Sequence, residues 1–76
     1  MELEKFIENL TEVFEDAKPE TIKPDAKFKD LEGYSSLVAL SLIAMVDEAY
    51  HVKIKGDDIR NAVTVEDLFN NVKSKQ

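Results

Sequence analysis

The chain has 76 residues, a net charge of −6, 43% hydrophobic and 34% charged residues, and no cysteine. This length suits one small domain over residues 1–76, near the size at which a single core is only marginally sufficient. Without cysteine, disulfides and thiolate metal sites are excluded. The acidic balance disfavours nucleic acid as a partner, and no apolar run is long enough for membrane insertion. Because the first residues are also unlike a signal peptide, we expect a cytoplasmic protein.

Residues 3–16 are predicted to form an amphipathic helix, because apolar residues recur at spacings of three and four. The predicted core stripe consists of Leu3, Phe6, Ile7, Leu10, Val13 and Phe14. Residues 17–34 are predicted to form a long loop, since Pro19 and Pro24 restrict the backbone and the apolar spacing is irregular. Its apolar side chains should hold it against the helices, and it could contain a short helical turn. Gly33 would permit a tight turn at its end.

Two adjacent serines follow this loop, and an apolar helical pattern over residues 36–50 begins at once. Ser35 is well placed as the N-cap, because its hydroxyl can accept from a free backbone N–H of the first turn. Ser36 would then be the first helical residue and point outward. The helix dipole and the unpaired N–H groups favour an anion there, so Ser36 could hold a phosphate. Serines at helix starts more often serve only as caps.

The helix over residues 36–50 is the most apolar segment, which indicates either a central helix or a contact surface. The expected buried face comprises Leu37, Leu40, Ile43, Ala44, Val46 and Tyr50, widened by Leu42 and Met45. Val38, by contrast, is expected to be exposed.

The remaining chain is predicted to contain a connector and two further helical segments. Residues 51–55 alternate polar and apolar but have no second strand to pair with, so we expect an extended connector. Residues 56–62 should form a loop leading into one short helical turn. A last helix over residues 65–72 should begin with a capping box between Thr64 and Asp67. Its apolar stripe is Val65, Leu68, Phe69 and Val72. The predicted fold class is therefore all-α.

Catalysis by the chain alone is not expected. There is one histidine and no cysteine, and no motif places a base beside a serine. Gly-rich phosphate loops and histidine clusters for zinc are absent as well. The acidic pairs at residues 47–48 and 57–58 lack the spaced oxygen ligands of a calcium loop, so no metal site is predicted. These exclusions leave a binding or carrying module.

Residues 28–37 contain the motif Phe-x-Asp-Leu-x-Gly-x-Ser-Ser-Leu. The following helix ends in Asp-Glu-Ala-Tyr, and the last helix starts with Thr-Val-Glu-Asp-Leu. In these three segments the chain resembles the acyl carrier protein family. The resemblance covers nearly the whole chain. It implies a small four-helix bundle with a long loop between the first two helices and a short third helix. It also implies that Ser36 carries a 4′-phosphopantetheine arm, transferred from coenzyme A, whose thiol holds acyl groups as thioesters. The chain would then be a carrier for fatty-acid or polyketide-like biosynthesis.

The resemblance further implies two groups of supporting residues. An acyl cleft would be lined by Leu40, Ile43, Ile59, Ala62 and Leu68. Partner enzymes would dock on Ser35, Leu37, Val38, Ser41, Asp47 and Glu48. These partners are a phosphopantetheinyl transferase and enzymes that transfer and condense acyl groups, acting on a monomeric carrier.

Three positions depart from the family pattern. Ser35 replaces the usual aspartate before the modified serine, although it caps a helix comparably well. Val38 and Ser41 stand where fatty-acid carriers usually have acidic docking residues, and Lys55 replaces a frequent proline. These changes suggest a carrier specialised for a secondary pathway. Two alternatives remain: an unmodified helical interaction domain in which Ser36 has no cofactor, and a carrier of amino acids of the D-alanyl type.

Overall fold

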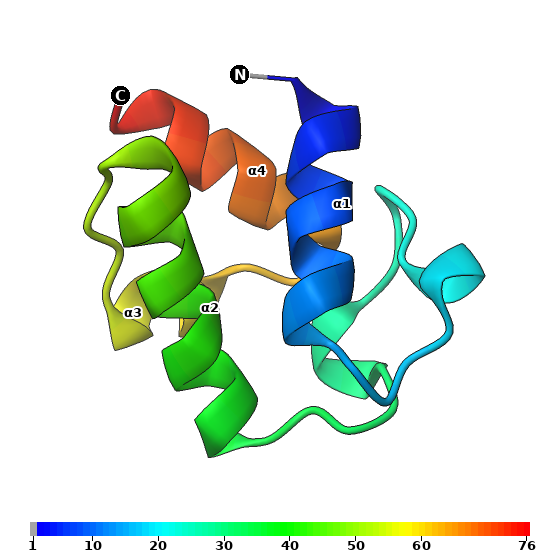
Figure 1. The fold of residues 1–76 in the computed structure, drawn as a ribbon. Coiled ribbons are helices and arrows are strands. Elements are labelled where there is room, and N and C mark those ends of the chain that lie inside the picture. Colours follow the sequence, from blue (N-terminus) through cyan, green and yellow to red (C-terminus); the bar gives the residue numbers. More distant parts are fainter. Residues whose placement is uncertain (1) are drawn as a thin grey trace.

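The computed structural model describes residues 2–76, and within that range the fold is all-helical (Figure 1). Four α-helices and two short 3₁₀ helices occur there: α1 Leu3–Val13, η1 Pro19–Thr21, η2 Phe28–Asp30, α2 Ser36–Tyr50, α3 Gly56–Asn61 and α4 Val65–Ser74. The all-α prediction and the long loop between the first two helices are confirmed. None of the described helices is long and apolar enough to cross a membrane.

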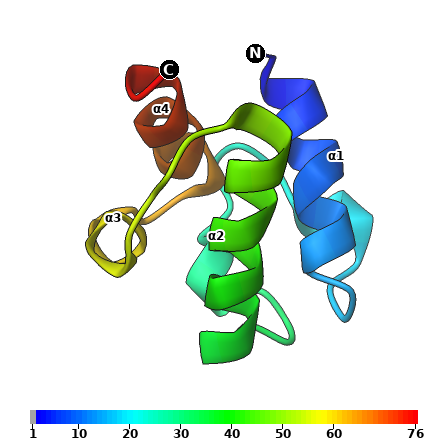
Figure 2. The same ribbon diagram turned by 60° about the vertical axis from the view of Figure 1, so that its left-hand side comes forward.

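The helices enclose one hydrophobic core. Helix α1 packs against both α2 and α4, and the short α3 packs against α4. Figure 2 shows α2 between α3 on one side and α1 on the other. The buried side chains of the three longer helices are Phe6, Leu10, Leu42, Val46, Val65, Leu68, Phe69 and Val72, and no polar or charged residue among those described is buried with them. The predicted stripe of α4 is therefore confirmed as core.

Helix α1 ends at Val13, three residues before the predicted end. Phe14 leaves the helical backbone angles, with φ −93° and ψ 66°, and its ring is buried. The N–H of Ala17 then donates to the carbonyl of Phe14 at 3.2 Å. Phe14 and Ala17 are both buried in the core at this turn, so Phe14 belongs to the core as predicted although the helix ends before it.

The long loop is fastened to the start of α4. The N–H groups of Val65 and Glu66 donate to the carbonyls of Ala26 and Pro24, both at 2.9 Å. The first N–H groups of a helix have no partner within the helix, so the loop supplies acceptors that α4 needs. Phe28 on η2 is completely buried. The expectation that apolar side chains hold the loop against the helices is confirmed.

The buried face of α2 differs from the prediction. Leu37 and Leu40 are 75% and 63% exposed, and Ala44 is exposed as well. Leu42 and Val46, which the prediction also included, are completely buried. Almost every residue in the first three turns of α2 is apolar, so the pattern of polar and apolar residues does not show which side of the helix faces the core.

The prediction that Val38 is exposed is also wrong. It is half-buried and packs against the core rather than facing solvent. Its position follows from helical spacing, because Val38, Leu42 and Val46 recur every four residues and so lie on one side of the helix. The exposed apolar surface of α2 is therefore made by Leu37 and Leu40.

The last third of the chain follows the prediction with small differences. The connector is extended, and Val52 and Ile54 are buried on it. It starts at His51, which ends α2 in the left-handed backbone conformation at φ 57°. Helix α3 begins directly at Gly56, without the predicted leading loop. Helix α4 continues two residues past its predicted end, to Ser74.

Candidate functional site

The two serines lie at the start of α2 as predicted. Ser35 is the N-cap, and its Oγ accepts a hydrogen bond from the backbone N–H of Val38 at 3.3 Å. Ser36 is the first residue of the helix and is exposed. Its hydroxyl therefore lies at the positive end of the α2 dipole, open to a partner molecule. The predicted cap on Ser35 is confirmed.

The chain entering α2 is held in place by the preceding loop. Gly33 has a backbone φ of 86°, in the left-handed region that glycine adopts without steric cost. A Cβ at this position would lie 2.8 Å from the Cβ of Asp16. The ring of Tyr34 stacks on Phe14, with centroids 6.3 Å apart, and meets Phe28 edge-on at 6.0 Å. These contacts fix the position from which Ser36 is presented.

A shallow hollow of about 360 Å³ opens beside Ser36, between α2 and α3. Its walls are mostly apolar and are formed by Tyr34, Ser36, Ala39, Leu40, Ile43, Gly56, Ile59 and Arg60. Three residues expected in an acyl cleft, Leu40, Ile43 and Ile59, lie on this wall. Ala62 and Leu68, named with them, are instead buried in the core. We call this space the Ser36 hollow.

Cationic groups of α3 and the loop lie next to this hollow. Arg60 lies on its wall and forms an exposed ion pair with Asp57. The Nζ of Lys29 donates to the carbonyl of Arg60 at 2.9 Å, where it complements the negative end of α3. An exposed ion pair of this kind contributes little to stability, so Arg60 can exchange Asp57 for another anion at small cost.

The start of α3 is held by one carboxylate. The backbone N–H of Lys55 donates to Asp58 Oδ2 at 2.9 Å, and this bond is the main reason that the pKa of Asp58 is lowered. The side chain of Asn71, at 3.3 Å, and the charge of Lys75 act in the same direction. Asp58 thereby ties α3 to α4 and positions the α3 wall of the Ser36 hollow.

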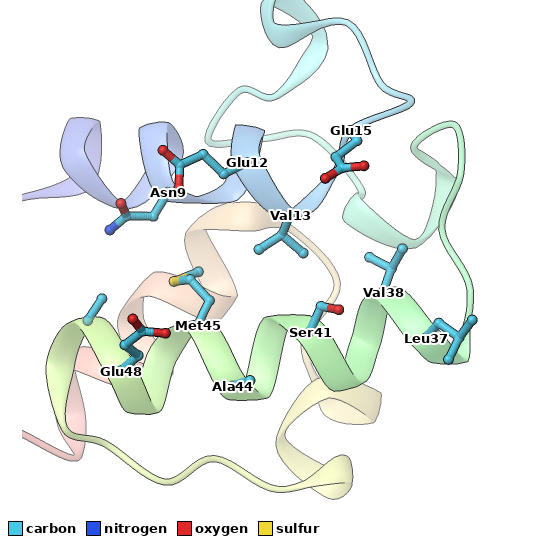
Figure 3. A pocket seen from close by; sticks show the side chains of 11 residues that line it. Asn9, Glu12, Val13, Glu15, Leu37, Val38, Ser41, Ala44, Met45 and Glu48 are labelled. Carbon is cyan, nitrogen blue, oxygen red and sulfur yellow. The ribbon is translucent and has the colours of Figure 1, made fainter.

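A second, larger space lies between α1 and α2, with a volume of about 740 Å³ (Figure 3). It is lined by Asn9, Glu12, Val13, Glu15, Leu37, Val38, Ser41, Ala44, Met45, Glu48 and Ala49. We call it the α1–α2 groove. It contains four of the residues expected to contact partners, Leu37, Val38, Ser41 and Glu48. Ser35 and Asp47 are exposed outside it.

The α1 side of this groove was not predicted from the sequence. Asn9 and Glu12 of α1, and Glu15 just after it, lie between core positions in the sequence and look like an ordinary solvated face. Only the packing of α1 beside α2 shows that these side chains border a shared space. The sequence carried no signal for it, because the arrangement depends on tertiary structure.

A model of the family described as "Phosphopantetheine attachment site" matches residues 4–72. The chain belongs to this family of phosphopantetheine-carrying proteins, and it is a carrier rather than an enzyme. It is also a distant homologue of an acyl carrier protein: the protein of that name from Nitratidesulfovibrio vulgaris (strain DSM 19637 / Miyazaki F) is 33% identical over 57 residues, which are 75% of this chain and 75% of the relative. The cofactor of the chain is thus phosphopantetheine.

The structure offers a place that fits such a cofactor. An exposed hydroxyl at a helix N-terminus suits a phosphodiester, which is anionic. The adjoining hollow is mostly apolar and open to solvent, as shelter for a flexible arm and an apolar cargo requires. When bound, the cofactor supplies a thiol that this cysteine-free chain lacks. Carrier proteins work with modifying and acyl-handling enzymes.

Proposed function

We propose that Ser36 is the attachment residue and that the chain carries acyl intermediates as thioesters. The observation that carries this proposal is the position of Ser36, which is exposed at the first turn of α2 and lies on the wall of the Ser36 hollow. Its neighbour Ser35 is committed to capping through the Val38 N–H. A transferase would join the Ser36 oxygen to the pantetheine-bearing phosphorus of coenzyme A. The hydroxyl proton is lost and adenosine 3′,5′-bisphosphate leaves.

The residues around Ser36 would bind the two parts of the loaded cofactor, its phosphodiester and its acyl chain. The α2 N-terminus and Arg60 favour the negative charge of the phosphodiester. Leu40, Ile43 and Ile59 offer apolar surface to the acyl chain. The cargo would belong to a fatty-acid or polyketide-like pathway. Val38 and Ser41 carry no charge where typical fatty-acid carriers are acidic, which favours a specialised pathway over the main fatty-acid one.

The first test compares the two adjacent serines by intact mass after incubation with coenzyme A and a broad-specificity phosphopantetheinyl transferase. Wild type should gain one phosphopantetheine, mapped by peptide analysis to Ser36. Ser36→Ala should gain none and melt like wild type, because only an exposed hydroxyl is lost. Ser35→Ala should still be modified but lose about 0.5–2 kcal/mol of stability, as for other N-cap deletions.

The outcomes separate the alternatives. Modification that persists in Ser36→Ala would move the attachment to another residue. No modification of folded wild type by several transferases would favour the unmodified interaction domain. Once modification is established, loading with acyl groups against loading with D-alanine distinguishes an acyl carrier from an aminoacyl carrier.

A further inference from the structure

The α1–α2 groove combines an apolar floor with an acidic rim. In Figure 3, Val13 points from α1 toward α2, while Val38 and Met45 point from α2 toward α1. These three side chains pack against the core and form the floor. Glu12, Glu15 and Glu48 are exposed and line the same space.

The charge of the groove has one sign. Its lining includes three glutamates and no lysine or arginine. Within residues 2–76, the ion pairs join Lys5 to Glu8, Arg60 to Asp57 and Lys75 to Asp58. None of the three groove carboxylates takes part in any of these pairs. The groove therefore presents free negative charge around apolar surface.

The groove and the Ser36 hollow lie on different sides of α2. No residue lines both spaces. Residues that are adjacent in α2 divide between them: Ser36 lines the hollow and Leu37 the groove. Leu37 is one of the most exposed large apolar side chains. A molecule seated in the groove would therefore leave Ser36 and its hollow accessible.

We propose that the α1–α2 groove is a docking site for a partner protein, which enters it with a segment carrying an apolar side chain flanked by lysine or arginine. The apolar side chain covers Val13, Val38 and Met45, and the cations pair with the glutamates of the rim. Complementary charge of this kind steers association and selects partners. A second copy of the chain is disfavoured, because it carries the same net charge of −6. The proposal does not depend on attachment at Ser36.

The end of α1 and the turn after it supply docking charge that the first three turns of α2 lack. The first three turns of α2, residues 36–46, contain no acidic residue. Glu12 and Glu15 lie across the groove from this uncharged stretch. A partner that requires negative charge beside the start of α2 would find it on Glu12 of α1 and on Glu15 in the turn that follows.

The test is a titration of the isotope-labelled unmodified protein with a short leucine–lysine peptide that has one apolar and one cationic helical face, followed by amide NMR shifts. The shifts should concentrate on the second half of α1 and on α2. Glu12→Lys combined with Glu15→Lys should weaken binding about tenfold or more, with the effect decreasing at high salt. The matched control combines Glu4→Lys with Glu20→Lys, which changes net charge equally at exposed positions outside the groove, and should retain most of the affinity.

A second variant leaves the glutamates in place. Ala44→Arg introduces a guanidinium at an exposed position of the groove, where it competes with the peptide, and it should also lose binding. Circular dichroism checks that each variant is folded. Equal losses in the groove pair and the control pair would overturn the proposal, because the peptide would then respond only to net charge. Shifts centred on the Ser36 hollow, or self-association through the groove, would overturn it as well.

Discussion

Gly33 makes the approach to Ser36 possible for two separate reasons. Its φ of 86° is unfavourable for residues with a Cβ. In addition, the Asp16 Cβ lies only 2.8 Å from where a new Cβ would be placed. The Asp16 side chain therefore lies directly against Gly33, which joins the turn after α1 to the entry of α2.

We expect Gly33→Ala to destabilise the protein by more than about 1 kcal/mol, because a Cβ is disfavoured by both backbone conformation and space. Gly56→Ala is the matched control, since no atom lies within 4 Å of the position that its new methyl group would take. The control should be neutral or stabilising by up to about 1 kcal/mol. Urea unfolding of the two variants measures the difference, and equal stabilities would contradict the role assigned to Gly33.

The start of α4 depends on a reciprocal capping box. Thr64 Oγ1 accepts from the N–H of Asp67 at 3.1 Å. Asp67 Oδ2 accepts in return from the N–H groups of Val63 and Thr64, at 2.9 and 3.0 Å. The Thr64 bond, followed by the Val63 bond, lowers the pKa of Asp67 below its ordinary value of 3.8. Two N–H groups at this helix start thus depend on one ionised carboxylate.

The lowered pKa of Asp67 predicts a pH-dependent contribution to stability. The native state favours the ionised form, so the contribution is complete above pH 3.8 and is lost as the pH falls through the native pKa. Asp67→Asn should therefore unfold more readily than wild type at pH 7, with a difference that shrinks in acid. Asp25→Asn, at an exposed loop position, controls for removal of one charge. Urea unfolding across pH provides the measurement, and a difference that grows in acid would contradict the assignment.

The helices differ in how far their packing could be predicted from the sequence. Polar residues separate the apolar stripes of α1 and α4, so Phe6, Leu10 and Val72 could be assigned to the core from spacing alone. Helix α2 has apolar residues on nearly every side, and its buried face was predicted wrongly for Leu37 and Leu40. The starts of α2 and α4 were predictable, because the capping residues Ser35 and Thr64 act on their own first turns.

Substitution of Phe28 tests whether packing of the long loop into the core contributes to stability. Its ring is completely buried, and Phe28→Ala should cost about 3–5 kcal/mol. A chain of this size has only about 4–11 kcal/mol in total, so the variant should lose at least about a quarter of its stability and at most all of it. Leu40→Ala, in the exposed part of α2, should change stability by less than about 0.5 kcal/mol. Thermal melts of both decide the point, and a large loss in Leu40→Ala would contradict the observed α2 face.

The candidate site was only partly accessible to prediction. The capping role of Ser35 and the position of Ser36 followed from adjacent residues. The division between the Ser36 hollow and the core did not, because Ile59 and Ala62 are close in sequence and yet only Ile59 reaches the hollow. Which side chains share a space depends on helix packing across the molecule.

The hydrogen bonds from Val65 and Glu66 to the carbonyls of Ala26 and Pro24 have a consequence for the kinetics of folding. They join segments from opposite halves of the sequence, so the first turn of α4 is completed only after the long loop has closed on it. Non-local closure of this kind slows folding relative to bundles with mainly local contacts. It also makes helix formation at the C-terminal end cooperative with ordering of the loop. We therefore expect the loop that presents Ser36 and the first turn of α4 to become ordered together.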